Sequence, residues 1–172
     1  VAGAAAFLIT GLVRWEDINS GVNWGVVLLY AAAISLGLQM KETGAAAWVA
    51  QNFLHVLSPL GAESGAGLWA AVSLLTTGVT NTMSNGAAVA VLGPIVLKLA
   101  VFADESPIVL GYITAISSAF AYLTVVGTPA CTIVYASGYL KATDFLRVGW
   151  KMVIMSTVMI LLTAGVYWPF LD

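Results

Sequence analysis

The sequence predicts an all-α membrane protein that crosses the bilayer several times. Of its 172 residues, 60% are apolar and only 8% are charged, whereas soluble domains carry about 25% charged residues. The mean hydropathy is +0.98, and the few charged residues divide the chain into long uncharged runs. Because a transmembrane helix needs about 20 mostly apolar residues, these runs predict helical spans within a single membrane domain, residues 1–172.

The charge pattern and the scarcity of reactive side chains exclude several classes of function. The net charge is −2 and the six basic residues are dispersed, so we expect no nucleic-acid partner. Cys131 is the only cysteine, which excludes an internal disulfide and a cysteine-built zinc site. His55 is the only histidine, and the sequence contains no visible nucleophile–base pair or metal-ligand cluster. We therefore do not expect an enzyme.

The first part of the chain predicts one full span and one surface helix. The chain begins inside an apolar run, residues 1–13, without an initiator methionine or the zones of a signal peptide, so we expect a fragment of a longer protein. Residues 18–40 form an uncharged stretch of 23 residues, long enough for a transmembrane helix. Polar residues interrupt the shorter apolar segment 45–57, which suits a helix lying in the membrane interface.

The uncharged run 64–97 has a length that favours a re-entrant hairpin. Its 34 residues are too many for one crossing and too few for two crossings with a turn. Residues 76–86, in the middle of the run, contain seven hydroxyl or amide side chains. Asn81 and the pair Asn85-Gly86 are poor helix-interior residues, so we expect the tip of the hairpin here. The alternative is that these polar groups only join neighbouring helices.

The next run, residues 106–140, predicts a helix that is broken within the membrane. Gly127-Thr128-Pro129 lies two-thirds of the way along it, and proline removes a backbone donor and obstructs the preceding turn. A proline kink without a ligand is the alternative for this segment alone. Residues 152–171 are again uncharged and long enough for a last full span.

Two interrupted helices in one chain indicate a site for ions. In transporters, the N-termini of half-helices face anionic groups, and unwound carbonyls bind sodium near the midplane of the membrane. One half-helix would begin after Gly86 and another after Pro129. Neither run contains Asp, Glu or His, which makes proton coupling the less favoured mechanism.

Several short motifs in a fixed order resemble those of a known family. The order is Ser84-Asn85-Gly86, Pro94, Gly127-Thr128-Pro129, then residues 133–138 and 145–149. Together they resemble the divalent anion:sodium symporter family, the dicarboxylate, citrate and sulfate carriers of the ion transporter superfamily. The resemblance covers nearly the whole chain and implies the C-terminal half of such a carrier, its second inverted repeat. It implies scaffold-like helices and an interfacial helix in residues 1–63, and a transport-like part in residues 64–172.

The resemblance also implies a set of site residues. The residues implied for substrate binding are Ser84, Asn85, Gly86, Thr128 and Pro129. Those implied for sodium are Thr80, Asn85, Gly127 and Thr128. The family has a threonine at the position of Gly86 and an asparagine at the position of Cys131, and these departures leave both a dicarboxylate and sulfate open as the anion.

As a function, the resemblance implies sodium-coupled symport of a small divalent anion by an elevator-type movement. Sodium would be co-transported, and the implied partners are the missing N-terminal repeat and a second copy in a homodimer. The implied location is the cell (inner) membrane, as a multi-pass protein. The alternatives are a sodium-independent anion channel or permease, and a non-transporting membrane subunit.

The positive-inside rule gives a topology that can be tested. Four basic residues fall on the predicted cytoplasmic side, namely Arg14, Lys141, Arg147 and Lys151, and two fall outside, namely Lys41 and Lys98. In a full-length carrier lacking Cys131, single cysteines at Asp104 and Thr143 should therefore react with an impermeant thiol reagent from opposite sides, Asp104 from outside. Labelling of both from one side would contradict the predicted crossing between them.

Overall fold

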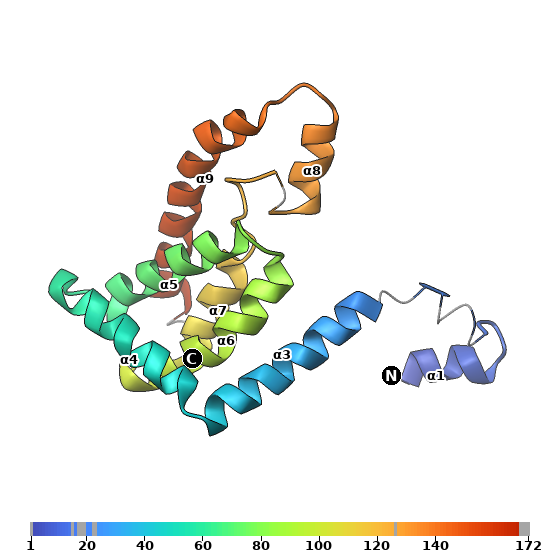
Figure 1. The fold of residues 1–172 in the computed structure, drawn as a ribbon, viewed down its shortest axis with the longest axis horizontal. Helices are drawn as coiled ribbons and strands as arrows, with labels where there is room; N and C mark the ends of the chain where they lie inside the picture. The colour runs from blue at the N-terminus through green and yellow to red at the C-terminus, as the bar shows by residue number, and fades with distance from the viewer. Residues whose placement is uncertain (1, 15, 17–19, 22–23, 126, 169–172) are drawn as a thin grey trace.

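The computed structural model describes residues 2–14, 16, 20–21, 24–125 and 127–168 of the chain. The described part of the chain contains helices and no β-strand, which confirms the all-α class (Figure 1). In chain order the elements are α1 (Ala2–Ile9), α3 (Trp24–Glu42), α4 (Ala45–Leu57), the 3₁₀ turn η1 (Ser58–Leu60), α5 (Gly65–Thr80), α6 (Asn85–Phe102), α7 (Pro107–Ser117), α8 (Pro129–Ala136), α9 (Ala142–Leu162) and the π-helical turn η2 (Thr163–Tyr167).

Helices α3 and α4 occupy the two segments that the sequence predicts as a span and a surface helix. Helix α3 covers 19 residues of the predicted span and continues to Glu42, while residues 18, 19, 22 and 23 lie outside the described residues. Helix α4 has the predicted bounds, and it buries Ala46, Ala50 and Leu57. Both helices pack against α6. The interfacial position of α4 stays a prediction.

The run predicted as a hairpin folds into two helices, α5 and α6, joined at the predicted tip. Helix α6 starts at Asn85 rather than after Gly86, because the Ser84 side chain caps it by accepting from Ala87 N at 3.4 Å. It also continues past Lys98 to Phe102. At the base of the hairpin, Gly65 N donates to Glu105 Oε1, which ties α5 to the α6–α7 connection. Re-entry of the hairpin into a membrane stays a prediction.

The segment predicted as a broken helix is interrupted, over a longer stretch than the sequence suggests, and its position within a membrane stays a prediction. Helix α7 already ends at Ser117, and α8 starts at Pro129. The described residues between them, 118–125 and 127–128, are not helical and are called the unwound segment. Proline at the first position and a Thr128 cap explain the start of α8. The early end of α7 has a tertiary cause, described with the site below.

A core formed by α5, α6 and α7, with α4 and α9 packed on it, holds the hairpin and the broken helix together. A 2.8 Å hydrogen bond between Ser73 Oγ of α5 and Ser117 Oγ of α7 joins two of these helices. The buried apolar residues of this cluster are Ala50, Leu57, Leu68, Val72, Leu92, Val96, Leu99, Ala100, Leu110, Ile113, Phe120, Ile160 and Ala164.

Helix α9 starts ten residues before the predicted last span, at Ala142 instead of residue 152. The Asp144 side chain explains this start, because its Oδ2 accepts from Lys141 N at 2.9 Å and caps the helix. The first turns of α9 therefore include charged residues that lie before the predicted last span. Gly149 is buried where α9 crosses the unwound segment, and an added Cβ there would overlap the carbonyl of Tyr122.

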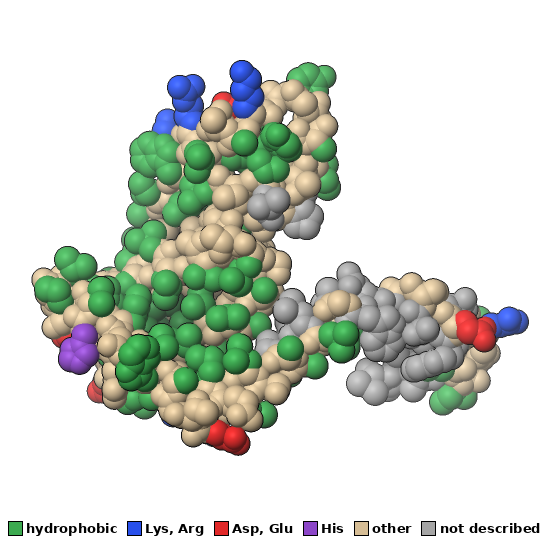
Figure 2. Space-filling view, in the orientation of Figure 1, with side chains coloured by type: hydrophobic (Ala, Val, Ile, Leu, Met, Phe, Trp, Pro, Cys, Tyr) green, Lys and Arg blue, Asp and Glu red, His purple; other side chains and the backbone are tan. Residues whose placement is uncertain are grey.

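The surface is apolar along the helices and basic at one end. Large hydrophobic side chains are exposed on most helices, and Figure 2 shows Lys and Arg gathered over the start of α9. Among the described residues, two helical stretches are long and apolar enough to cross a membrane, Asn85–Phe102 and Ala142–Tyr167. The α8–α9 connection and the α6–α7 connection lie at opposite ends of the helical body (Figure 1), an arrangement compatible with the predicted topology.

The contact at Gly149 generates a stability prediction. Gly149→Ala should lower the free energy of unfolding by about 1–3 kcal/mol, because the new methyl group forces the backbone of α9 and the unwound segment apart. Gly111→Ala in α7 is the control, since a Cβ at Gly111 meets no atom within 4 Å. Thermal unfolding of the purified protein in detergent measures both variants. A midpoint for Gly149→Ala at or above that of Gly111→Ala would contradict the packing described.

Candidate functional site

Three neutral oxygen atoms converge at the end of α5. The Thr80 hydroxyl is buried and lies 2.7 Å from the carbonyl oxygen of Ser118 and 2.9 Å from Asn85 Oδ1. A hydroxyl carries one hydrogen, so the two acceptors must share it. The bond to Ser118 also explains the early end of α7, because this carbonyl accepts from a side chain of the hairpin instead of from a helical amide.

The Asn81 side chain joins the hairpin tip to the unwound segment. Asn81 is 5% exposed. Its Nδ2 donates to Thr77 O at 2.7 Å and lies 3.4 Å from Phe120 O, and its Oδ1 accepts from Leu123 N at 2.8 Å. The Thr124 hydroxyl in turn donates to Asn81 O at 2.8 Å. The two connected segments therefore behave as one hydrogen-bonded unit.

Gly127 and Thr128 lie where the unwound segment turns into α8. Gly127 is buried, and an added Cβ would lie 2.8 Å from Ala121 Cβ and 3.1 Å from Thr124 Oγ1. Thr128 Oγ1 accepts from Cys131 N at 3.2 Å and so caps α8. The Cys131 thiol donates to Ala121 O at 3.6 Å. Glycine is needed at position 127 because the segment folds back on itself there.

The predicted site residues fall into two neighbouring groups. Thr80 and Asn85 are in direct contact, and Ser84 and Gly86 flank Asn85 at the start of α6. Gly127, Thr128 and Pro129 form the start of α8, and the Asn81–Thr124 hydrogen bond links this group to the tip. No hydrogen bond between described residues joins Thr128 to Ser84 or Asn85, and the Pro129 side chain lies outside the described side chains.

Three contributing residues, Asn81, Thr124 and Ser118, are missing from the predicted set. Asn81 belongs to the polar stretch 76–86 that the sequence singles out, but its spacing does not distinguish it from its neighbours. The contribution of Ser118 is a backbone carbonyl, which no side-chain pattern can reveal. Only the contact between hairpin and unwound segment identifies these residues.

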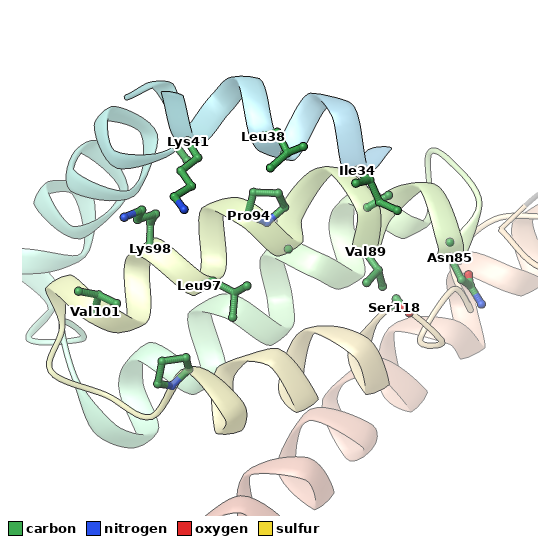
Figure 3. A pocket seen from close by; sticks show the side chains of 16 residues that line it. Ile34, Leu38, Lys41, Asn85, Val89, Pro94, Leu97, Lys98, Val101 and Ser118 are labelled. Atoms are coloured by element: carbon green, nitrogen blue, oxygen red, sulfur yellow. The ribbon is translucent and has the colours of Figure 1, made fainter. Parts of the chain in front are cut away.

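An open groove leads away from the tip between α3 and α6. It has a volume of about 960 Å³ and is lined mostly by apolar side chains. Figure 3 shows Asn85 and Ser118 at one end and Lys41 and Lys98 at the other, with Pro94 between them.

The site contains no acidic group that could bind a cation. Among the residues that the structure describes, no three His, Cys, Asp or Glu side chains lie together. A cation at the tip would therefore depend on neutral oxygens such as those of Thr80, Asn85 and Ser118. An anion would depend on hydroxyl and amide donors and on the N-termini of α6 and α8.

The fold and this uncharged polar site define a helical membrane protein with interrupted helices, an architecture typical of secondary transporters. The family model described as the sodium:sulfate symporter transmembrane region matches residues 1–172. The chain therefore belongs to this family of membrane transporters, which confirms the resemblance to the divalent anion:sodium symporters.

Curated relatives from distant organisms agree with this assignment. An uncharacterized transporter of Synechocystis is 28% identical over 91% of the chain, and solute carrier family 13 member 1 of Mus musculus is 28% identical over 91%. The sodium-dependent high-affinity dicarboxylate transporter 3 of Caenorhabditis elegans is 32% identical over 80%. The matched regions cover 25%, 26% and 24% of these relatives, so the chain spans about a quarter of their length.

The role of Asn81 generates a prediction about local opening. Asn81→Ala should speed amide hydrogen exchange across residues 118–128 by about tenfold or more, because each buried group left without a partner costs about 1–3 kcal/mol. Mass spectrometry of exchanged peptides measures this. Asn52→Ala is the matched control, since the exposed Asn52 amide bonds only within α4, to Trp48 O at 2.8 Å. Equal exchange of residues 118–128 in both variants would refute the role given to Asn81.

Proposed function

We propose that this chain is part of a sodium-coupled symporter that carries a small divalent anion across the cell (inner) membrane. The observation that carries the proposal is the convergence of neutral oxygens at the junction of two interrupted helices, in a chain of this family. Relatives described as sodium-dependent dicarboxylate transporters, from Caenorhabditis elegans and Staphylococcus saprophyticus, support sodium as the coupled ion.

The sodium ion binds at the tip of the hairpin. Sodium is a hard cation that prefers oxygen ligands. Thr80 Oγ1 lies 2.9 Å from Asn85 Oδ1 and 2.7 Å from the Ser118 carbonyl oxygen, so it brings both oxygens to the tip. Rotation of the Thr80 hydroxyl hydrogen would free all three oxygens for a cation. Gly127 and Thr128, the other proposed sodium ligands, belong to the loop that the Asn81–Thr124 bond holds beside this tip.

The anion binds to the groups at the two helix N-termini. Ser84, Asn85 and Gly86 form the start of α6, and Thr128 and Pro129 form the start of α8. The positive ends of both helix dipoles, the hydroxyl and amide donors and the bound sodium compensate the negative charge of the anion. With a glycine at position 86 and a cysteine at position 131, the family's dicarboxylate and sulfate remain the two candidate substrates.

Transport follows an elevator-type movement, in which the hairpin and the broken helix carry both ions across together. Residues 64–172 move as a unit, consistent with the hydrogen bonds that join α5, the unwound segment and α7. Residues 1–63 belong to the stationary scaffold, which an N-terminal repeat of the same protein completes. The working carrier is a homodimer.

The ion site generates a transport prediction for the full-length carrier. Asn85→Ala should weaken sodium activation about tenfold to a hundredfold, because the loss of one buried oxygen ligand costs about 1–3 kcal/mol. Affinity for the anion should fall with it, since coupling between two bound ligands is reciprocal. Uptake into liposomes, titrated with sodium at several anion concentrations, measures both effects.

Gly86→Thr is the control for this experiment. It adds a hydroxyl beside the anion and should change the preference between dicarboxylate and sulfate while leaving sodium activation nearly unchanged. If the folded Asn85→Ala carrier keeps the original sodium dependence, the assigned ion site is wrong. Uptake by the unaltered carrier that does not respond to a sodium gradient would favour a sodium-independent channel or permease instead.

A further inference from the structure

The groove between α3 and α6 has the form of a site for an amphipathic molecule. Its wall is apolar over most of its length, with Ile34 and Leu38 from α3 facing Val89, Pro94 and Leu97 from α6 (Figure 3). An apolar wall does not stabilise a dianion, because it cannot replace the hydrogen bonds that water makes with the dianion. The groove is therefore unsuited as a pathway for the transported anion and suited to a hydrocarbon chain.

Two lysines lie at one end of the groove. Lys41 from α3 and Lys98 from α6 lie at the same end, and Figure 3 shows both side chains there. No ion pair between described residues neutralises either amino group. The carboxylate of Glu105 in the adjoining connection is engaged elsewhere, by Gly65 N and by Trp69 Nε1 at 3.2 Å.

The groove is long enough to reach through one leaflet of a bilayer. From Lys98 to Asn85, α6 rises about 20 Å at about 1.5 Å per residue, and one leaflet of a hydrocarbon core of about 30 Å is about 15 Å thick. The charged end lies beside the α6–α7 connection, where a membrane surface would be, and the apolar part leads inward to the hairpin tip.

Glycine residues shape the groove between α3 and α6. Gly37 lets α3 approach α6 closely, since an added Cβ would lie 3.0 Å from Pro94 Cγ. Gly93 lines the groove next to this contact, and an added Cβ there meets no atom within 4 Å. The groove is thus closed on one side by Gly37 and Pro94 and open along Gly93.

From these observations we infer that the α3–α6 groove binds one acyl chain of an anionic phospholipid, whose phosphate is held by Lys41 and Lys98. The two lysines favour a lipid with an anionic headgroup, and the apolar wall of the groove favours its acyl chain. This inference goes beyond the proposed function and does not depend on it, because lipid binding is measured without transport.

The test is titration of the purified full-length carrier with phosphatidylglycerol, followed by native mass spectrometry. Phosphatidylcholine with the same acyl chains is the uncharged-headgroup comparison and should bind more weakly. The double variant Lys41→Gln/Lys98→Gln should lose affinity for phosphatidylglycerol about thirtyfold, the equivalent of about 2 kcal/mol, because each lysine near an anionic lipid surface contributes about 1 kcal/mol. Lys141→Gln/Lys151→Gln removes the same charge at the start of α9 and should leave the affinity unchanged.

A second variant tests the hydrocarbon part of the site separately. Gly93→Phe should fill the groove and reduce phosphatidylglycerol binding with both lysines intact, whereas Gly111→Phe, outside the groove, should not. Unchanged binding in Gly93→Phe would overturn the acyl-chain site. If inorganic phosphate displaces phosphatidylglycerol and binds as tightly as the lipid does, the two lysines form a phosphate site and the lipid proposal is wrong. Absence of lysine-dependent lipid binding would overturn the proposed lipid site.

Discussion

The hydrogen bonds between the hairpin tip and the unwound segment are the constraint on which the rest of the arrangement depends. A break in a helix leaves backbone groups without partners, and in apolar surroundings each unsatisfied group costs about 1–3 kcal/mol. Asn81 satisfies Leu123 N, and Thr80 satisfies Ser118 O. The segment 118–128 can therefore remain unwound only while the hairpin is packed against it, and the two interrupted helices are stable together rather than separately.

The same constraint explains why the site is polar but uncharged. Asn and Thr side chains can both donate and accept, so one residue can serve a backbone N–H and a backbone C=O at once, as Asn81 does. A carboxylate in this place would accept only, and its charge would be costly so far from water. Under the proposed function, a bound sodium ion would supply the positive charge that this uncharged junction lacks for binding an anion.

The apolar surface of the chain has a similar explanation. Side chains such as Ile9, 85% exposed, and Tyr139, 91% exposed, would be unfavourable in water. The chain belongs to a family of membrane transporters, and apolar faces of this kind suit contact with lipid. It spans about a quarter of the length of its relatives. Where α3 meets α6, Gly37 and Pro94 decide how closely the two backbones approach, and the space beside Gly93 is open.

The sequence by itself determined the helical membrane class, the hairpin and its tip, and the start of α8. These features follow from local physics: charge-free runs of a given length, a concentration of Asn, Thr and Ser, and the missing amide of Pro129. The motifs of the family resemblance also contain Asn85 and Thr128, which lie at the start of α6 and at the start of α8. Sequence boundaries were least accurate where charged residues enter a helix, as in α9, because charge at a membrane surface does not end a helix.

Only the tertiary structure decided where α7 ends and which polar residue joins the two interruptions. Nothing between residues 117 and 126 is a strong helix breaker in the sequence, and α7 ends at Ser117 because Thr80 and Asn81, some 40 residues earlier in the chain, take over the hydrogen bonds. The carbonyl of Ser118 and the space beside Gly93 are likewise properties of chain packing. Every residue has a backbone carbonyl, and a cavity depends on how helices pack. A pattern of side chains in the sequence therefore predicts neither of these features.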